Sequence, residues 1–166
     1  YILTNSRSLT ADEARTLGLE VAGNIQASAA EKGKKCLLIS RSDSTLRGHY
    51  PLEVEVLTQV LQAAKPIHFI VPAFFEGGRY TIDDVHYVRE GEQMIPAADT
   101  PFAQDKVFGY RNSDLKAWVQ EKFDGQIDDA KIHSLSIDAL EQQSAESIAA
   151  RIDTFQAHDV CVVNAS

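Results

Sequence analysis

Between residues 14 and 25, apolar side chains recur every three or four residues, which is the spacing of one face of a helix. Thr10 precedes this run, and its spacing to Glu13 is that of a capping box. Gly33 offers a C-terminal stop. The pattern therefore predicts a helix over residues 11–31.

Three short apolar runs, at residues 1–4, 35–40 and 67–71, have the length and composition of buried strands. A helix is predicted after the second run, because Pro51 suits a first helical position and apolar residues then recur at helical spacing to Leu61. Strands that alternate with helices indicate a parallel sheet with right-handed crossovers. The loops that follow the three strands should therefore emerge at one edge of the sheet.

The middle of the chain is less regular. Short alternating runs on both sides of Asp83 and Asp84 predict a β-hairpin excursion near residues 80–95. The stretch from Pro96 to Phe108 is polar and irregular, and we interpret it as a lid or an insertion.

The α/β alternation resumes toward the end of the chain. Ser113 is predicted to cap a helix that Asp124-Gly125 ends. Residues 131–137 then predict a strand, residues 144–156 a helix, and residues 160–163 a last strand. Helices would thus cover both faces of a sheet.

Composition supports one globular α/β protein. With 166 residues, 44% apolar and 24% charged, the chain is long enough for a single domain with a sizeable core. We expect a three-layer α/β/α fold with a mostly parallel sheet, in one domain over residues 1–166. The net charge of −8 argues against a nucleic-acid or anionic-membrane surface. No apolar run approaches the ~18 residues of a membrane span, and we expect a cytoplasmic protein.

The cysteines and histidines do not form a metal-binding pattern. Cys36 and Cys161 both lie in apolar, strand-like runs, where a buried thiol fits better than a disulfide or a metal ligand. The histidines show no HxxxH or HxH spacing, so we expect no metal site. The glycine motifs of nucleotide-binding loops and the GxSxG motif of serine hydrolases are also absent from the sequence.

Residues 41–48 crowd hydroxyls, a carboxylate and two guanidinium groups into one loop between a predicted strand and a helix. Asp43 can accept hydrogen bonds from ligand hydroxyls, whereas Ser44 and Thr45 can both donate and accept them. Such side chains can also simply cap the backbone of their own loop. Arg47 favours a ligand, because a guanidinium held by a following glycine offers a planar fork for a carboxylate. The loop therefore predicts an anionic polyol as ligand.

Two further polar loops follow the other predicted strands. Asn5-Ser-Arg7 follows the first strand, and Glu76-Gly-Gly-Arg79 follows the third. Each alone is compatible with an ordinary turn. Arginines 7, 47 and 79 would nevertheless project from one sheet edge of an acidic protein, and this convergence favours a ligand site. His49 is a further candidate for ligand contact, whereas we interpret His86 as a packed histidine.

At these residues the sequence resembles a known family. Asp43-Ser-Thr-Leu-Arg-Gly48 is similar to the DSTLRG signature of the four-carbon acid sugar kinases. Thr4-Asn-Ser-Arg7 resembles the family's TxSR segment, and Val71-Pro-Ala-Phe74 with Gly78-Arg79 resembles its PAFPxxGR segment. The resemblance covers most of the chain.

The resemblance implies an N-terminal domain that binds the acid sugar and a separate C-terminal domain that binds ATP. Together they would phosphorylate a tetronate or a 3-oxo-tetronate. ATP and Mg²⁺ would be cofactors of the full-length protein and would bind mainly to the C-terminal domain, with none expected here. The partners would be a small acid sugar and that C-terminal domain, with no nucleic acid and no membrane; a homodimer stays open. The family's DDLTGA segment and its ATP domain are not found in residues 1–166, so we expect a fragment that is inactive alone.

On this interpretation Asp43 is the catalytic candidate, because it either fixes the substrate hydroxyls or accepts the proton of the reacting one. The substrate carboxylate would bind Arg47, with Arg7 or Arg79 as a second donor. The full set of predicted substrate-binding residues is Ser6, Arg7, Ser44, Thr45, Arg47, Gly48, Gly78 and Arg79. A non-enzymatic module that binds or senses a sugar acid is the alternative. A Rossmann oxidoreductase is disfavoured, because no dinucleotide glycine motif follows a predicted strand.

Overall fold

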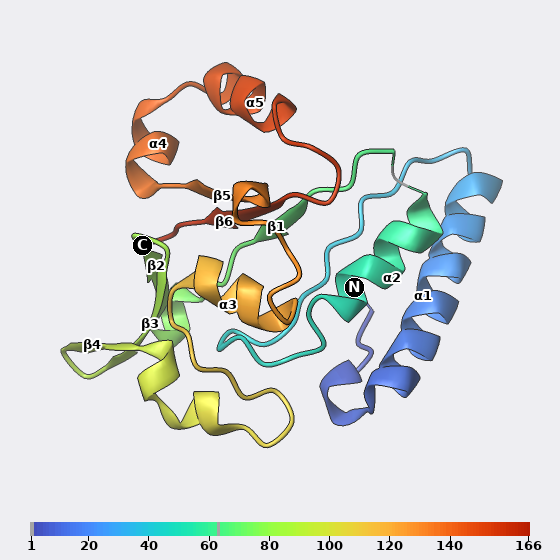
Figure 1. The fold of residues 1–166 in the computed structure, drawn as a ribbon. Coiled ribbons are helices and arrows are strands. Elements are labelled where there is room, and N and C mark those ends of the chain that lie inside the picture. The colour runs from blue at the N-terminus through green and yellow to red at the C-terminus, as the bar shows by residue number, and fades with distance from the viewer. Residues whose placement is uncertain (1, 63) are drawn as a thin grey trace. The chain divides into compact units, whose positions relative to one another are not determined.

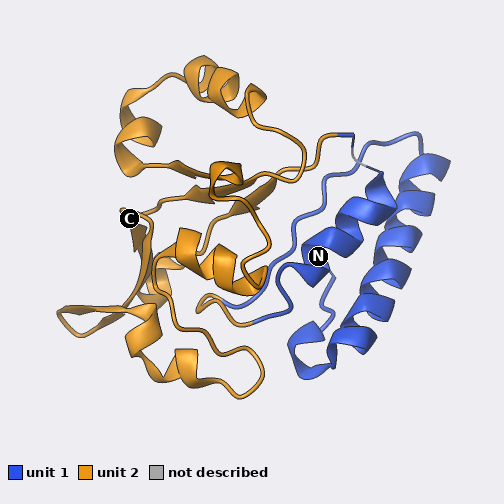
Figure 2. Cartoon of the chain, in the orientation of Figure 1, with its two compact units in different colours: residues 1–43, 48–64 blue, residues 44–47, 65–166 orange. Residues whose placement is uncertain are grey.

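The computed structural model describes residues 2–62 and 64–166 (Figure 1). The chain forms two compact units (Figure 2). The first comprises Tyr1–Asp43 and Gly48–Ala64, and the second comprises Ser44–Arg47 and Lys65–Ser166. Four residues of the loop singled out above therefore belong to the second unit, whereas the residues on either side of them belong to the first.

The first unit is built on two helices, α1 (Ala11–Glu31) and α2 (Leu52–Leu61). The predicted capping box is present, because the Thr10 hydroxyl accepts the Glu13 N–H at 3.4 Å and the Glu13 carboxylate accepts the Thr10 N–H at 2.9 Å. These bonds satisfy two donors that the first turn of a helix leaves without intrahelical partners. The helix predicted over residues 11–31 is confirmed.

The two helices pack closely where Gly18 faces Val56. A β-carbon on Gly18 would lie 3.1 Å from a methyl group of Val56, and the Val56 side chain is almost wholly buried. The missing side chain therefore lets the second helix approach the first.

The strands predicted at residues 1–4 and 35–40 are wrong for the residues that are described: neither 2–5 nor 34–43 forms a strand. Tyr1 lies outside the described residues. Leu37 and Ile39 are 86% and 80% exposed, and Cys36 is exposed rather than buried. An apolar run favours extended backbone, but a strand also needs a neighbour for its N–H and C=O groups. Of the three strands whose loops were predicted to leave one sheet edge, only that near residues 67–71 forms among the described residues.

The second unit contains a parallel sheet of β1 (His68–Ile70), β6 (Val160–Val163) and β5 (Ile132–Leu135), in that order. His68 and Ile132 both pair with Val160, which fixes the register of the sheet. The side chains of Val160 and Val162 are fully buried. The central position of β6 explains its unbroken apolar sequence, because a central parallel strand is covered on both faces.

Helices lie on both sides of this sheet: α4 (Ile137–Gln142) and α5 (Ala145–Asp153) on one side, and α3 (Leu115–Lys122) on the other (Figure 1). Beneath α5, the buried side chains of Leu135, Phe155 and Cys161 form a core against which Ile148 and Ile152 pack. The predicted α/β class is confirmed.

Two boundaries in this region differ from the predictions. The strand predicted over residues 131–137 stops at Leu135, because Ser136 caps α4 by accepting the Ala139 N–H at 3.2 Å. Asp114, not Ser113, caps α3, with its carboxylate 2.9 Å from the Ala117 N–H. Serine and aspartate serve equally well as caps, so their order in a short polar segment does not identify the first helical residue.

A second, antiparallel sheet contains β2 (Arg79–Ile82), β3 (Val85–Glu90) and β4 (Gln93–Pro96). Asp83 and Asp84 form the turn between the first two strands with φ of 50° and 65°. Two positive φ values are typical of the tight turns that match the twist of a hairpin. The predicted hairpin is confirmed, and β4 extends it to three strands.

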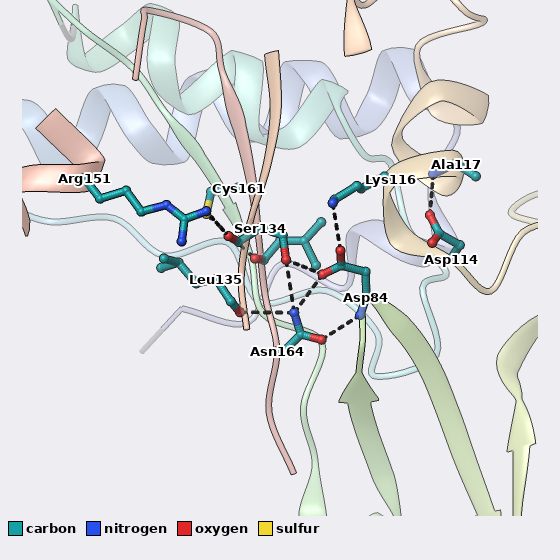
Figure 3. Close-up of polar contacts among 10 residues, drawn as sticks. Asp84, Asp114, Lys116, Ala117, Ser134, Leu135, Arg151, Cys161 and Asn164 are labelled. Carbon is teal, nitrogen blue, oxygen red and sulfur yellow. Dashed lines mark hydrogen bonds and ion pairs between the residues drawn. The ribbon is translucent and has the colours of Figure 1, made fainter. Parts of the chain in front are cut away.

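Four polar side chains join the hairpin turn to the parallel sheet and to α3: Asp84, Lys116, Ser134 and Asn164, which we call the hairpin clasp (Figure 3). The Asn164 amide donates to the Asp84 carboxylate at 2.7 Å and accepts the Asp84 backbone N–H at 2.7 Å. Lys116 forms a 2.9 Å ion pair with the same carboxylate, and the Ser134 hydroxyl donates to it.

The clasp also sets the charge state of its carboxyl group. Burial alone would raise the pKa of Asp84, but the hydrogen bonds from Ser134, Asn164 and Lys116, with the charge of Lys116, outweigh burial and lower that pKa. The hairpin is therefore held at the carboxyl ends of β5 and β6 by a charged, hydrogen-bonded group.

Candidate functional site

In the first unit, the predicted residues Ser6, Arg7 and Asp43 lie around one polar mouth. An Arg7 guanidinium nitrogen lies 3.0 Å from an Asp43 carboxylate oxygen. The Ser6 hydroxyl donates to the Glu53 carboxylate at 2.5 Å. Residues 6–9 are held there by His49, whose Nε2 lies 3.2 Å from the Ser6 carbonyl oxygen and 3.0 Å from the Leu9 one. The His49 ring thus holds residues 6–9 in place through their backbone carbonyl groups.

These residues border a cleft of about 490 Å³. Its mouth is polar, and the side chains of α1 and α2, among them Leu17, Val21 and Leu57, form an apolar part of its lining. This volume lies within the usual range for sites that bind small molecules. Arg7 and Arg41 bring positive charge to the mouth, and Asp43 and Glu53 bring negative charge.

Gly48 lies at the same cleft and is needed there for close approach. A β-carbon on Gly48 would clash with the Ser42 hydroxyl and lie 3.2 Å from the Ser42 β-carbon. Glycine is needed at position 78 for a different reason: the φ of Gly78 is +72°, and a β-carbon there would lie 3.1 Å from the β-carbon of Arg89. The backbone therefore explains Gly78 without a ligand.

In the second unit, residues 44–47 form a tightly packed turn. Thr45 is fully buried, and Leu46 is 6% exposed at a φ of 66°. This left-handed conformation is unfavourable for a residue that carries a β-carbon. Ser44 is anchored through its carbonyl oxygen, which lies 3.0 Å from Nε2 of His86 in β3. The turn therefore holds its shape through contacts with the hairpin.

Arg47 and Arg79 meet at one aromatic ring. Their guanidinium carbons lie 4.9 Å and 5.2 Å from the centre of the Phe102 ring, within the range of a cation–π contact. Thr45 accepts the Nε–H of Arg47 at 3.0 Å, and Asp105 is 3.9 Å from the Arg47 guanidinium. Arg79 donates to the Gly77 carbonyl. Two positive charges and one negative charge thus gather in an otherwise acidic protein.

Arg79 also has a donor that no described residue uses. Its Nε is buried and has no hydrogen-bond partner within residues 2–62 and 64–166. Buried polar groups in folded proteins nearly always have partners, and one without a partner has a specific cause, of which a bound ion or water is one. The pair of arginines is therefore suited to binding an anion.

The structure brings the predicted residues together in two sets. Ser6, Arg7, Asp43 and Gly48 share the cleft of the first unit. Residues 44–47 and Arg79 belong to the second unit, where Arg47 and Arg79 share the Phe102 ring. The roles of these residues in binding or catalysis stay predictions.

Sequence reasoning missed three side chains that belong to these sets. Glu53 looks like an ordinary first-turn acid of α2, and nothing in its neighbours indicates that Ser6 binds it. Phe102 and Asp105 fall in the polar stretch that we interpreted as a lid or an insertion. No sequence spacing places Phe102 against two arginines that lie 55 and 23 residues before it, since that contact forms only when the chain folds.

Within the described part of the chain, no group of three or more His, Cys, Asp or Glu side chains is arranged to hold a metal ion. Among the same residues, no helix has both the length and the apolar character that crossing a membrane requires.

Comparison with known proteins identifies the family. The model of the sugar-binding N-terminal domain family matches residues 1–166, which is the whole chain. The chain belongs to this family. The comparison with curated proteins found no match.

Solved structures share the fold of this family member at low sequence identity. A Bordetella bronchiseptica domain of unknown function, with bound citrate and as a domain-swapped dimer, is 22% identical with a TM-score of 0.69. A Haemophilus influenzae protein of the same family of unknown function is 15% identical with a TM-score of 0.67. A Salmonella typhimurium LT2 protein, described as a proposed tRNA synthase, is 17% identical with a TM-score of 0.70.

The coverage of these matches is unequal. They cover 99%, 96% and 96% of this chain, but only 35%, 36% and 36% of the other chains. The chain therefore spans about a third of the length of the structures that it resembles. The sugar-binding domain implied by the resemblance is supported, whereas the kinase stays a prediction.

Proposed function

We propose that this domain binds a small sugar acid and that Arg47 and Arg79 hold its carboxylate. The observation that carries the proposal is the pair of guanidinium groups on the Phe102 ring, of which Arg79 keeps a buried Nε–H without a partner among the described residues. A guanidinium fork matches a carboxylate in charge and geometry. Membership of a sugar-binding family supports the polyol part of the ligand. The citrate in the Bordetella structure supports the acid part.

We further propose that the domain serves an ATP-dependent kinase whose substrate is a four-carbon sugar acid, a tetronate or a 3-oxo-tetronate. The DSTLRG residues 43–48 support this finer statement. Nucleotide and Mg²⁺ would bind mainly outside this chain. ATP would supply the phosphoryl group. This chain would hold and orient the acceptor, which is the main requirement of phosphoryl transfer.

The test of acid binding is calorimetry with a panel of four-carbon sugar acids, with citrate as a second probe. Arg47→Ala should weaken binding by about 1.5–3 kcal/mol, the usual loss of a charge-assisted contact. Arg15→Ala is the matched control, because it also removes a guanidinium, but from an exposed position of α1 that does not line the cleft. An unchanged dissociation constant in Arg47→Ala would contradict the carboxylate assignment.

The kinase is tested separately, by following ADP release from MgATP with each acid and the full-length protein. Asp43 is the candidate base, and Asp43→Asn should lower turnover while leaving the dissociation constant of the acid within a few-fold. Acid binding without ADP release would favour the alternative, a module that binds a sugar acid for regulation. The Arg47 contact would stand in either case.

A further inference from the structure

His86 is completely buried in β3, and both of its ring nitrogens are engaged. Nδ1 lies 3.1 Å from the Thr81 hydroxyl and Nε2 lies 3.0 Å from the Ser44 carbonyl oxygen. The second contact joins the hairpin to the turn that carries Arg47.

The partners of the ring fix its tautomer. A carbonyl oxygen can only accept, so the proton of the neutral ring lies on Nε2 and is donated to Ser44. Nδ1 is then an acceptor for the Thr81 hydroxyl, which lies 3.1 Å from Nδ1 and 3.4 Å from its other acceptor, the Pro72 carbonyl oxygen. Thr81 and His86 face each other across β2 and β3, and both are fully buried, which keeps the ring orientation constant.

The anchored turn needs such support because of its backbone. Leu46 holds a φ of 66° while its side chain is buried. Such a conformation persists only where the surroundings fix it. The Ser44 carbonyl lies two residues before Leu46 and three before Arg47, so a bond at Ser44 restricts how the chain can rotate before it reaches the guanidinium.

The hairpin that carries His86 is itself fixed at its turn. Asp84, two residues before His86, is bonded to Asn164 by both its carboxylate and its backbone N–H. The His86 N–H donates to the Ser113 carbonyl at 2.8 Å. Hydrogen bonds at Asp84 and at the His86 backbone thus hold the strand segment whose side chain contacts Ser44.

We propose that His86 is a positioning residue for acid binding: its Nε2–H holds the Ser44 carbonyl, and this fixes the strained turn that directs Arg47 toward Phe102 and Arg79. The identity of the ligand rests on the proposed function, whereas the contact between His86 and the Ser44 carbonyl does not depend on it. His86 lies outside residues 41–48, and its Nε2–H is the donor that this loop needs for binding.

The test compares three variants by calorimetry with the sugar acid that the wild-type protein binds, together with citrate. His86→Leu removes the donor and should weaken binding about tenfold or more, the equivalent of one such hydrogen bond. His86→Gln keeps an N–H near the place of Nε2, so it should restore most of the affinity. Val88→Ala is the control, because Val88 is buried on the same face of β3 and carries no polar group.

Melting temperatures separate positioning from stability. Both His86→Leu and Val88→Ala should lower the melting temperature, but only His86→Leu should lower affinity when binding is measured well below the transitions. Equal affinity in His86→Leu and the wild type, equal losses in the two destabilised variants, or no rescue by His86→Gln would each overturn the proposal. If His86→Leu does not fold, Thr81→Val disturbs the tautomer in its place and should also weaken binding.

Amide hydrogen exchange gives a readout that needs no ligand. Residues 44–47 should exchange faster in His86→Leu than in Val88→Ala and more slowly again in His86→Gln. If the wild-type protein binds no sugar acid, the proposed function fails, but this exchange pattern still decides whether His86 orders the turn. If the acids bind and exchange at 44–47 is the same in all variants, the positioning role fails while the function stands.

Discussion

Asn164→Ala removes the centre of the hairpin clasp. The Asn164 side chain is almost wholly buried, and its amide donates at 2.7 Å to the Asp84 carboxylate and at 3.1 Å to the Leu135 carbonyl. Its oxygen accepts the Asp84 N–H at 2.7 Å. Alanine can replace none of these bonds.

The expected loss of unfolding free energy is about 3 kcal/mol. A hydrogen bond to a charged group contributes about 1.5–3 kcal/mol, and each buried partner left unsatisfied costs about 1–3 kcal/mol. These terms overlap, because all of them involve one side chain, so they do not sum. Urea unfolding followed by fluorescence measures the difference, and an unchanged slope against urea shows that stability alone has changed.

The same variant changes the response to acid. Because the folded-state pKa of Asp84 is lowered, the group adds stability above its unfolded pKa of about 3.9, and that stability is lost as the pH falls through the folded pKa. Asn164→Ala removes one of the bonds that lower the pKa, so its stability should depend less on pH in this range.

Asn24→Ala is the matched control, because Asn24 is an exposed position of α1. It should change the unfolding free energy by no more than about 0.5 kcal/mol. A loss below about 1 kcal/mol in Asn164→Ala, or one equal to that of the control, would refute the reasoning. A double-mutant cycle with Ser134→Ala should give a coupling of about 0.5 kcal/mol or more, since both side chains bind the same carboxylate.

Two further predictions follow from other contacts. Thr10→Ala should cost about 1 kcal/mol of stability by removing the capping box of α1, and Thr10→Ser should keep most of it, as thermal unfolding followed by circular dichroism would show. Burial alone would raise the pKa of Asp159, but hydrogen bonds from the Gln156 N–H and His133, with the charges of His133 and Lys131, lower it. Stability from Asp159 is therefore present above its unfolded pKa and lost as the pH falls through the folded pKa, so Asp159→Asn should flatten the acid side of the stability curve in urea unfolding. An acid side that is as steep as that of the wild type would contradict the assignment.

Three elements were predicted correctly from patterns within a few consecutive residues. The capping box of α1, the two-aspartate turn of the hairpin and the apolar run of β6 each lie within a few consecutive residues, and all three are confirmed. The capping box and the turn have causes that act within the same short stretch, a hydrogen bond to a neighbouring N–H and a tolerated positive φ, whereas the apolar run of β6 is the local sign of a strand that other segments bury on both faces.

Some of the wrong predictions depended on partners far away along the chain, and others on which of two local roles a residue takes. Residues 35–40 have the composition of a strand, yet no strand forms there, because pairing depends on a neighbour that the composition does not specify. Cys36 was expected to be buried for the same reason and is exposed. The α4 helix was missed, because Ser136 could continue a strand or cap a helix, and only its bond to Ala139 decides between them.

In the candidate site, too, some features follow from the sequence and others only from the tertiary structure. The sequence alone determined that hydroxyls, a carboxylate and arginines gather between residues 41 and 48, which is the chemistry of an anionic polyol site. Only the tertiary structure decided that Arg47 shares the Phe102 ring with Arg79 and that a buried histidine of the hairpin holds Ser44. The sequence of a loop states which functional groups it carries. The direction of each side chain depends on burial and on hydrogen bonds to segments that only folding brings near.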